Sequence, residues 1–155
     1  MGKVTEDVKI TSYDSLRDFK NKIIKEAEIK SLYLQNVIID SGVTLMCLSK
    51  KLIEKLGLEP LRTVKVNTAE GIKETTIYGP VLIEIKDRAV RQDVMELKHP
   101  GIDALIGQLP LEQLDFLINP SIQRLIPNPE HDNQMILDQL IVSEDYKYEI
   151  KMNEF

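Results

Sequence analysis

The sequence predicts a mainly β protein with one or two short helices and a further helix near the N-terminus. From residue 33 onward, apolar residues fall into short runs rich in β-branched side chains, separated by Gly, Pro or Asn. These runs are residues 33–34, 37–39, 63–66, 76–78, 81–85 and 94–97. A chain of 155 residues, 43% of them hydrophobic, can bury one core but is too short for two ordinary domains.

The N-terminal helix is predicted over residues 14–27. Apolar residues recur there every three or four positions, and Asp14 can cap the first turn. The residues on this apolar face are Leu16, Phe19, Ile23 and Ala27. We expect this amphipathic helix to cover a sheet or a partner.

A short helix and a hairpin are predicted within the strand-rich region. Residues 49–56 carry their apolar side chains on one helical face, and Gly57 follows at a position where helices commonly end. Residues 69–72 separate two alternating runs and predict the tip of a β-hairpin. Gly71 would supply the positive φ that such a turn often requires.

Three segments follow from these patterns. They are an N-terminal arm with the amphipathic helix (1–31), one folded domain (32–129) and a C-terminal extension (130–155). Within the extension, residues 135–142 fit a short helix and residues 146–152 alternate as in an amphipathic strand.

Charge and composition argue against several classes of function. The formal net charge is −5, and no basic run is long enough to hold a phosphate backbone, so we expect no nucleic-acid partner. Residues 1–10 lack the apolar stretch of a secretory signal, and no run of about eighteen apolar residues occurs, which predicts a cytoplasmic protein without membrane contact. Cys47 is the single cysteine, and His99 and His131 show no metal-ligand spacing. We therefore expect no disulfide within the chain, no metal and no cofactor.

Asp40 is the candidate for chemistry. The apolar residues 37–39 bring it to the end of a buried strand, and Ser41-Gly42 forces a tight turn that lets a second backbone approach closely. A carboxylate at such a place is costly without a purpose or a partner. The tripeptide alone is weak evidence, because Asp-Ser-Gly is also common in surface turns.

The surroundings of Asp40 resemble the retropepsin-like aspartic proteases. In that family an apolar run is followed by Asp, then by Thr or Ser, then by Gly, then by a small or apolar residue, and finally by Ser or Thr. Later in the chain, a pair of apolar residues is followed by a second glycine and a helix. The matching segments are 37–44, 104–107 with the following 109–114, the hairpin 69–72 between them, and the closing strands 117–120 and 124–127, as in prokaryotic single-domain members. The resemblance covers residues 32–129.

The resemblance implies a closed β barrel or sandwich with a flap hairpin, and a role for each matching residue. Asp40 would be catalytic, the hydroxyl of Ser41 would bond across a dimer axis, and Gly42 would offer its carbonyl to the substrate. The remaining site residues are Thr44, Ala69, Glu70, Gly71 and Ile72 near the substrate, and Leu105, Ile106 and Gly107 as support for the Asp40 loop. Candidates to line substrate pockets are Leu45, Ile72, Val81, Ile83 and Leu105.

Hydrolysis of a peptide bond without a covalent intermediate needs one group that takes a proton from water and another that gives one to the carbonyl oxygen. Two carboxylates about 3 Å apart do both, because they share one proton. The sequence contains one Asp-Ser-Gly and no Asp-Thr-Gly. An aspartic endopeptidase of this kind therefore has to be a homodimer in which both Asp40 residues meet.

Three alternatives stay open at this stage. A catalytically inactive module that keeps the fold for dimerisation or peptide binding would not need both Asp40 and Ser41. A metal-dependent hydrolase would be sensitive to chelators, but the ligand pattern disfavours it. A serine nucleophile would need a histidine base, and neither His99 nor His131 accompanies a Gly-x-Ser-x-Gly turn. The acidic and Arg residues that brace viral dimers are replaced by residues 44–45 and Gln108, so the strength of the dimer does not carry over. The resemblance to viral members also implies terminal strands that interleave at the subunit interface. Residues 8–10 or 146–152 are the candidates for such a strand, and a solvated tail is the alternative.

Overall fold

The computed structural model describes residues 3–139 and contains a closed β barrel of six strands. In order around the barrel these are β1 (Thr5–Ser12), β2 (Ser31–Ile39), β7 (Ala104–Ile106), β3 (Met46–Ser49), β6 (Arg88–Leu97) and β5 (Gly71–Ile85). Pairing of β1 with β5 closes the ring. The mainly β barrel that the sequence predicts is confirmed.

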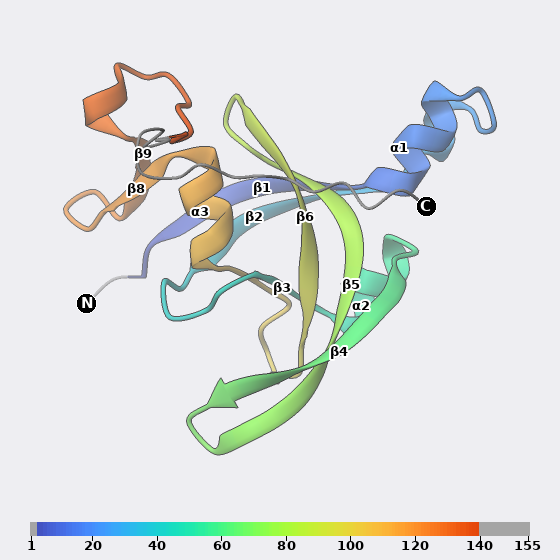
Figure 1. Ribbon diagram of the computed structural model, residues 1–155, viewed down its shortest axis with the longest axis horizontal. Coiled ribbons are helices and arrows are strands. Elements are labelled where there is room, and N and C mark those ends of the chain that lie inside the picture. The colour runs from blue at the N-terminus through green and yellow to red at the C-terminus, as the bar shows by residue number, and fades with distance from the viewer. Residues whose placement is uncertain (1–2, 140–155) are drawn as a thin grey trace, which may run out of the picture.

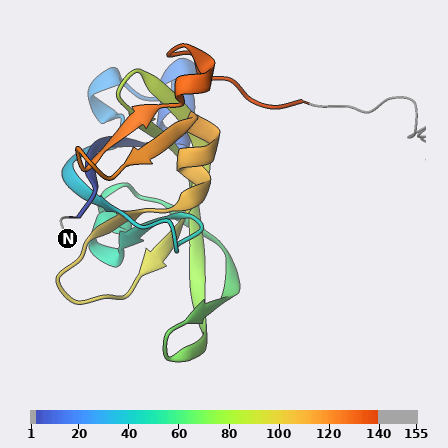
Figure 2. The same ribbon diagram turned by 90° about the vertical axis from the view of Figure 1, so that its left-hand side faces the viewer.

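The long strand β5 changes partner along its length. Residues 71–79 pair with β4 (Glu59–Thr68), whereas residues 81–84 pair with β1. A register shift between Tyr78 and Val81 separates the two halves. The β4–β5 hairpin consequently extends beyond the barrel, as Figures 1 and 2 show in two perpendicular views.

The main core fills the barrel with aliphatic side chains from every strand of the ring. Among those with no measurable exposure are Ile10, Met46, Leu48, Ile83, Val94 and Ile106. Burial of each such side chain contributes about 1.5–3 kcal/mol. These contacts hold the strand ends that carry the candidate site.

Helices and a small second sheet surround the barrel. They are α1 (Tyr13–Lys20), η1 (Glu26–Glu28), α2 (Lys50–Lys55), α3 (Gln108–Leu114), β8 (Phe116–Asn119), β9 (Arg124–Pro127) and η2 (Pro129–His131). The predicted helix before Gly57 is confirmed as α2, with Leu52 and Ile53 buried. In the described part of the chain, no helix is long and apolar enough to span a membrane.

The N-terminal helix is shorter than the sequence predicts. Ser12 caps it by accepting a hydrogen bond from the backbone N–H of Ser15, so Asp14 lies inside the first turn. The helix stops at Lys20 because Asn21 is its C-cap and Lys22 adopts a left-handed φ of 61°. Ile23, which the sequence predicts on the apolar face, is 69% exposed.

Two expectations about the terminal segments are wrong. Residues 8–10 do not form an interface strand, because they lie in β1 and pair with β2 and β5 of the same barrel. The helix predicted over residues 135–142 is not formed in its described part, since residues 134–139 have no regular structure. The strand predicted over residues 146–152 lies outside the described residues.

Candidate active site

Asp40 lies at the exposed end of β2, in a turn fixed by hydrogen bonds. β2 and β7 run parallel with Ile39 opposite Ile106, and the backbone N–H of Asp40 donates to the carbonyl of Ile106 at 2.9 Å. The N–H of Gly42 donates to Oδ1 of Asp40 at 2.9 Å, and the N–H of Val43 donates to the Asp40 carbonyl at 3.1 Å. The carboxylate is thus held at the barrel surface by its own turn.

The two signature segments cross at Gly107. Beyond it, the backbone N–H groups of Gln108 and Leu109 donate to the carbonyls of Val43 and Thr44 at 2.7 and 2.8 Å. A Cβ on Gly107 would lie 2.3 Å from the carbonyl oxygen of Leu45. Only glycine permits this approach, so the loop that holds Asp40 depends on the second signature.

One face of the sheet carries a row of apolar side chains beside Asp40. Strand pairing places Leu105 opposite Cys47, Cys47 opposite Met95, and Met95 opposite Ile77. Directly paired residues point to the same side of a sheet. Cys47 and Ile77 are buried but do not belong to the main core, whose side chains occupy the opposite face. We call the face that bears these four residues the site face.

The charge of Asp40 reaches this face. Burial raises the pKa of the Cys47 thiol to about 11, and the negative charge of Asp40 adds to that rise. The thiol contacts the carbonyl of Leu45 at 3.7 Å. Cys47 is therefore a protonated packing residue on the floor beside the carboxylate.

The β4–β5 hairpin is the element expected to be the flap. Its tip lies on the same side of the barrel as the segment between β2 and β3 in both ribbon views (Figures 1 and 2). Gly71 has a φ of 110°, as the turn requires, and Glu70 forms an ion pair with Lys73 at 2.6 Å. Ala69 and Glu70 form the exposed turn.

The structure brings most of the predicted site residues together. Ser41 and Thr44 are exposed beside Asp40, Leu105 lies half-buried on the site face, and Ile106 belongs to the core that supports the loop. Ile72 differs: it pairs with Asn67 on the side of the hairpin opposite the site face and is 72% exposed.

The pocket-lining role expected for Val81 and Ile83 is wrong, because both are completely buried in the main core. The sequence does not predict that Cys47, Met95 and Ile77 lie on the site face. Their positions follow from which strands pair and in which register, and a single sequence carries no signal of that pairing beyond the alternation of each strand.

Two hollows on the barrel lie away from the Asp40 turn. The larger, about 470 Å³, lies between residues 33–38 of β2, residues 101–104 and Leu52. The smaller, about 270 Å³, is lined by three charged residues of β1, by Glu84 of β5, by Lys86 and by Tyr33 of β2. Within residues 3–139, no group of three or more His, Cys, Asp and Glu side chains is placed to hold a metal ion.

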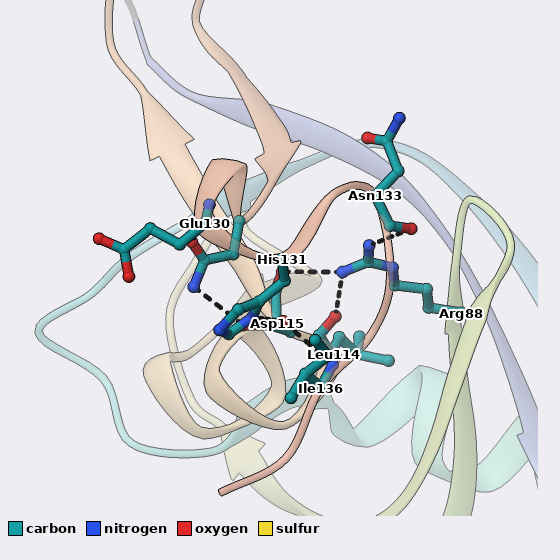
Figure 3. A network of polar contacts seen from close by, with 8 residues as sticks. Arg88, Leu114, Asp115, Glu130, His131, Asn133 and Ile136 are labelled. Carbon is teal, nitrogen blue, oxygen red and sulfur yellow. Dashed lines mark hydrogen bonds and ion pairs between the residues drawn. The ribbon is translucent and has the colours of Figure 1, made fainter.

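A second polar cluster joins the end of α3 to the segment that follows β9 (Figure 3). The buried Asp115 carboxylate accepts hydrogen bonds from Asn128 Nδ2 at 3.2 Å, the Ile136 N–H at 3.1 Å and Nδ1 of His131. Arg88 donates to the carbonyls of Leu114 and Asp115, both at 2.8 Å, and to that of Asn133 at 3.1 Å. The residues of this cluster brace the barrel and lie apart from the Asp40 turn in sequence.

A closed β barrel that interlocks an Asp-Ser-Gly turn with a second glycine loop defines the retropepsin-like class of fold. A family model described as aspartyl protease matches residues 26–109, more than half of the chain and both signature segments. The chain belongs to this aspartyl protease family. No curated protein matches the sequence.

Proposed function

We propose that the chain is an aspartic endopeptidase that acts as a homodimer, with Asp40 of each subunit at a shared site. The observation that carries the proposal is the interlocked turn: Asp40 is exposed, its backbone is fixed by Ile106, and the loop behind it is locked against Gly107. Catalytic carboxylates require such rigid placement. Membership of the aspartyl protease family supports the same chemistry.

A second copy of the chain would complete the acid pair. One Asp40 carboxylate, as the ionised partner, takes a proton from water while the water oxygen attacks the peptide carbonyl carbon; the protonated partner gives its proton to the carbonyl oxygen. The C–N bond of the resulting tetrahedral diol then breaks: the leaving nitrogen takes the proton that the first carboxylate accepted from water, and one hydroxyl of the diol returns a proton to the second. Two carboxylates about 3 Å apart share one proton, which keeps both roles filled.

The remaining elements have roles that fit an extended peptide. The β4–β5 hairpin would close over the substrate and add main-chain hydrogen bonds. The site face, with Leu105, Cys47 and Met95, offers an apolar floor beside the acid pair. The hydroxyl of Ser41, the residue after Asp40, would bond across the dimer axis.

The variant Asp40→Asn tests the proposal. It keeps the shape and the hydrogen bond from Gly42 but removes the shared proton, so we expect peptide cleavage to fall by at least about a thousandfold while dimerisation, measured by analytical ultracentrifugation, is retained. Cleavage of a mixed peptide library is followed by mass spectrometry. Equal cleavage by both proteins would overturn the assignment of Asp40.

A further inference from the structure

The β4–β5 hairpin has two chemically different faces. Its register is unbroken from Arg62 opposite Ile77 to Thr68 opposite Gly71, so alternate residues lie on alternate faces. Ile77 belongs to the site face, and we call the side of the hairpin that it shares the inner face. The other residues of the inner face are Arg62, Val64, Val66, Lys73 and Thr75. The outer face bears Thr63, Lys65, Asn67, Ile72, Glu74 and Thr76.

Burial supports this assignment. Val64 and Val66 are half-buried and Thr75 is 8% exposed, whereas Thr63, Lys65 and Asn67 are exposed. The inner face is therefore apolar along its middle. It extends the apolar surface formed by Met95 and Ile77 along the hairpin toward its tip.

The charges on the two faces also differ. On the outer face Lys65 lies directly opposite Glu74, so the pair is neutral. On the inner face Lys73 near the tip is compensated by Glu70, and no salt bridge joins Arg62 to a carboxylate within residues 3–139. Both side chains of the Glu70–Lys73 pair are exposed. Exposed ion pairs of this kind contribute only about 0–1 kcal/mol to the stability of the fold. A carboxylate brought under the hairpin can replace Glu70 as the partner of Lys73.

We infer that the inner face of the hairpin selects peptides with an acidic side chain flanking an apolar pair at the cleaved bond. Val64 and Val66 would contact the apolar residues, and Lys73, with Arg62 at the other end, would pair with the acidic one. Arg62 and Lys73 are separated by four residue steps along the hairpin, roughly 13 Å at the rise of a strand. Val64 lies between the levels of the two cations, and Lys73 lies directly opposite Val66 at one end of the apolar stretch. The inference rests on the proposed function, because it concerns the same site.

Paired peptides test the inference. Each pair has two central apolar residues and differs only in a flanking Glu or its neutral isostere Gln, and the measured quantity is the ratio of kcat/KM within one protein. We expect the native protein to favour the Glu peptide by about fivefold to tenfold, as a charge-assisted hydrogen bond at a partly dry site would give. Lys73→Glu should abolish or reverse this ratio.

Lys65→Glu is the matched control, because it changes the same charge on the same hairpin but on the outer face. It should leave the Glu/Gln ratio at the native value. Since each ratio is taken within one protein, a loss of folded material cannot produce the effect. Equal ratios for Lys73→Glu, Lys65→Glu and the native protein overturn the inference while leaving the peptidase proposal in place.

Binding separates the inference from the proposed function. The affinity of the same fluorescent peptides for the Asp40→Asn protein, measured by anisotropy, does not depend on hydrolysis. A Glu preference that disappears in Asp40→Asn/Lys73→Glu supports the inference even if the native protein cleaves nothing. The inference is overturned if the Asp40→Asn protein binds the Glu and Gln peptides equally well and if, where cleavage occurs, kcat/KM is also equal for the two peptides.

Discussion

Gly107 is the residue at which the two signature segments touch. A Cβ at this position would lie 2.3 Å from the Leu45 oxygen and 2.7 Å from the Val43 oxygen, both of them backbone atoms. Backbone cannot rotate away as a side chain can, so the Asp40 loop would have to move. The placement of the carboxylate therefore depends on the absence of one methyl group.

Gly107→Ala should lower the free energy of unfolding by about 1–3 kcal/mol, the usual cost of overpacking a filled site. Urea denaturation measures the change. The control is Gly42→Ala, whose Cβ would meet only the Asp40 side-chain oxygen, at 3.2 Å. A side-chain oxygen can shift by a few tenths of an ångström, so this control should cost less. Equal stability losses would show that the crossing does not control the loop.

Cys47 reports on the closure of the site face. The residue is 3% exposed and the pKa of its thiol is raised to about 11 from 9.0, so at pH 8 the reactive thiolate is about a hundredfold scarcer than in an unperturbed thiol. We predict that alkylation of the native protein is at least that much slower than alkylation of the same protein in urea. Fast labelling without denaturant would mean that the site face opens readily.

The strands of the hairpin show where prediction from sequence ends. The turn at Gly71 and the Asp40 turn each depend on a few adjacent residues, and both were predicted correctly in position. The face on which Ile72 lies depends on the register that links it to Asn67 and, through Ile77, to Met95. Val81 and Ile72 carry the same apolar character, yet the first lies in the core and the second in solvent. Pairing of distant strands decides between these outcomes, and local pattern does not contain it.

The segment after β9 shows the same limit. Asp115 ends α3 in a left-handed conformation and binds Asn128, His131 and Ile136, which follow it by 13, 16 and 21 residues. No local signal links these positions. The result is that residues 128–136 are fastened to the end of α3, the helix that begins directly after Gly107.

The Asp115 carboxylate should make this fastening dependent on pH. Burial alone raises the pKa of Asp115, but the hydrogen bonds from His131, Ile136 and Asn128 outweigh burial and hold the pKa below its usual value. A carboxyl group whose folded pKa is lowered stabilises the fold fully above its unfolded pKa of about 3.9, and the stabilisation is lost as the pH falls through the folded pKa.

Asp115→Asn should therefore destabilise the protein by about 1–3 kcal/mol at pH 7, because buried donors lose a charged acceptor. The difference from the native protein should shrink as the pH falls below about 4. Urea denaturation over a pH series gives both quantities. The matched control is Asp132→Asn, an exposed residue of the same segment that already has a left-handed backbone, which asparagine tolerates. A difference that stays constant with pH would contradict the role of the charge.

At the scale of the whole molecule, the barrel supplies half of the proposed acid pair. The single Asp-Ser-Gly turn lies at the surface, where a second copy can approach it, and one barrel cannot supply the second carboxylate from an equivalent turn. A two-fold axis would make the two turns equivalent and bring the same residues together from both sides. The rate of hydrolysis should then depend on the number of dimers in which both subunits carry Asp40, and not on the total number of chains that carry it.

Mixed dimers distinguish these cases. Native and Asp40→Asn chains are unfolded together, refolded in varied proportions, and assayed for peptide cleavage at constant total protein. If each site needs Asp40 from both subunits, activity follows the square of the native fraction, and equal mixing leaves about one quarter of it. If each chain works alone, equal mixing leaves about one half. The quadratic curve is expected because a single carboxylate cannot both take a proton from water and hold one for the carbonyl oxygen.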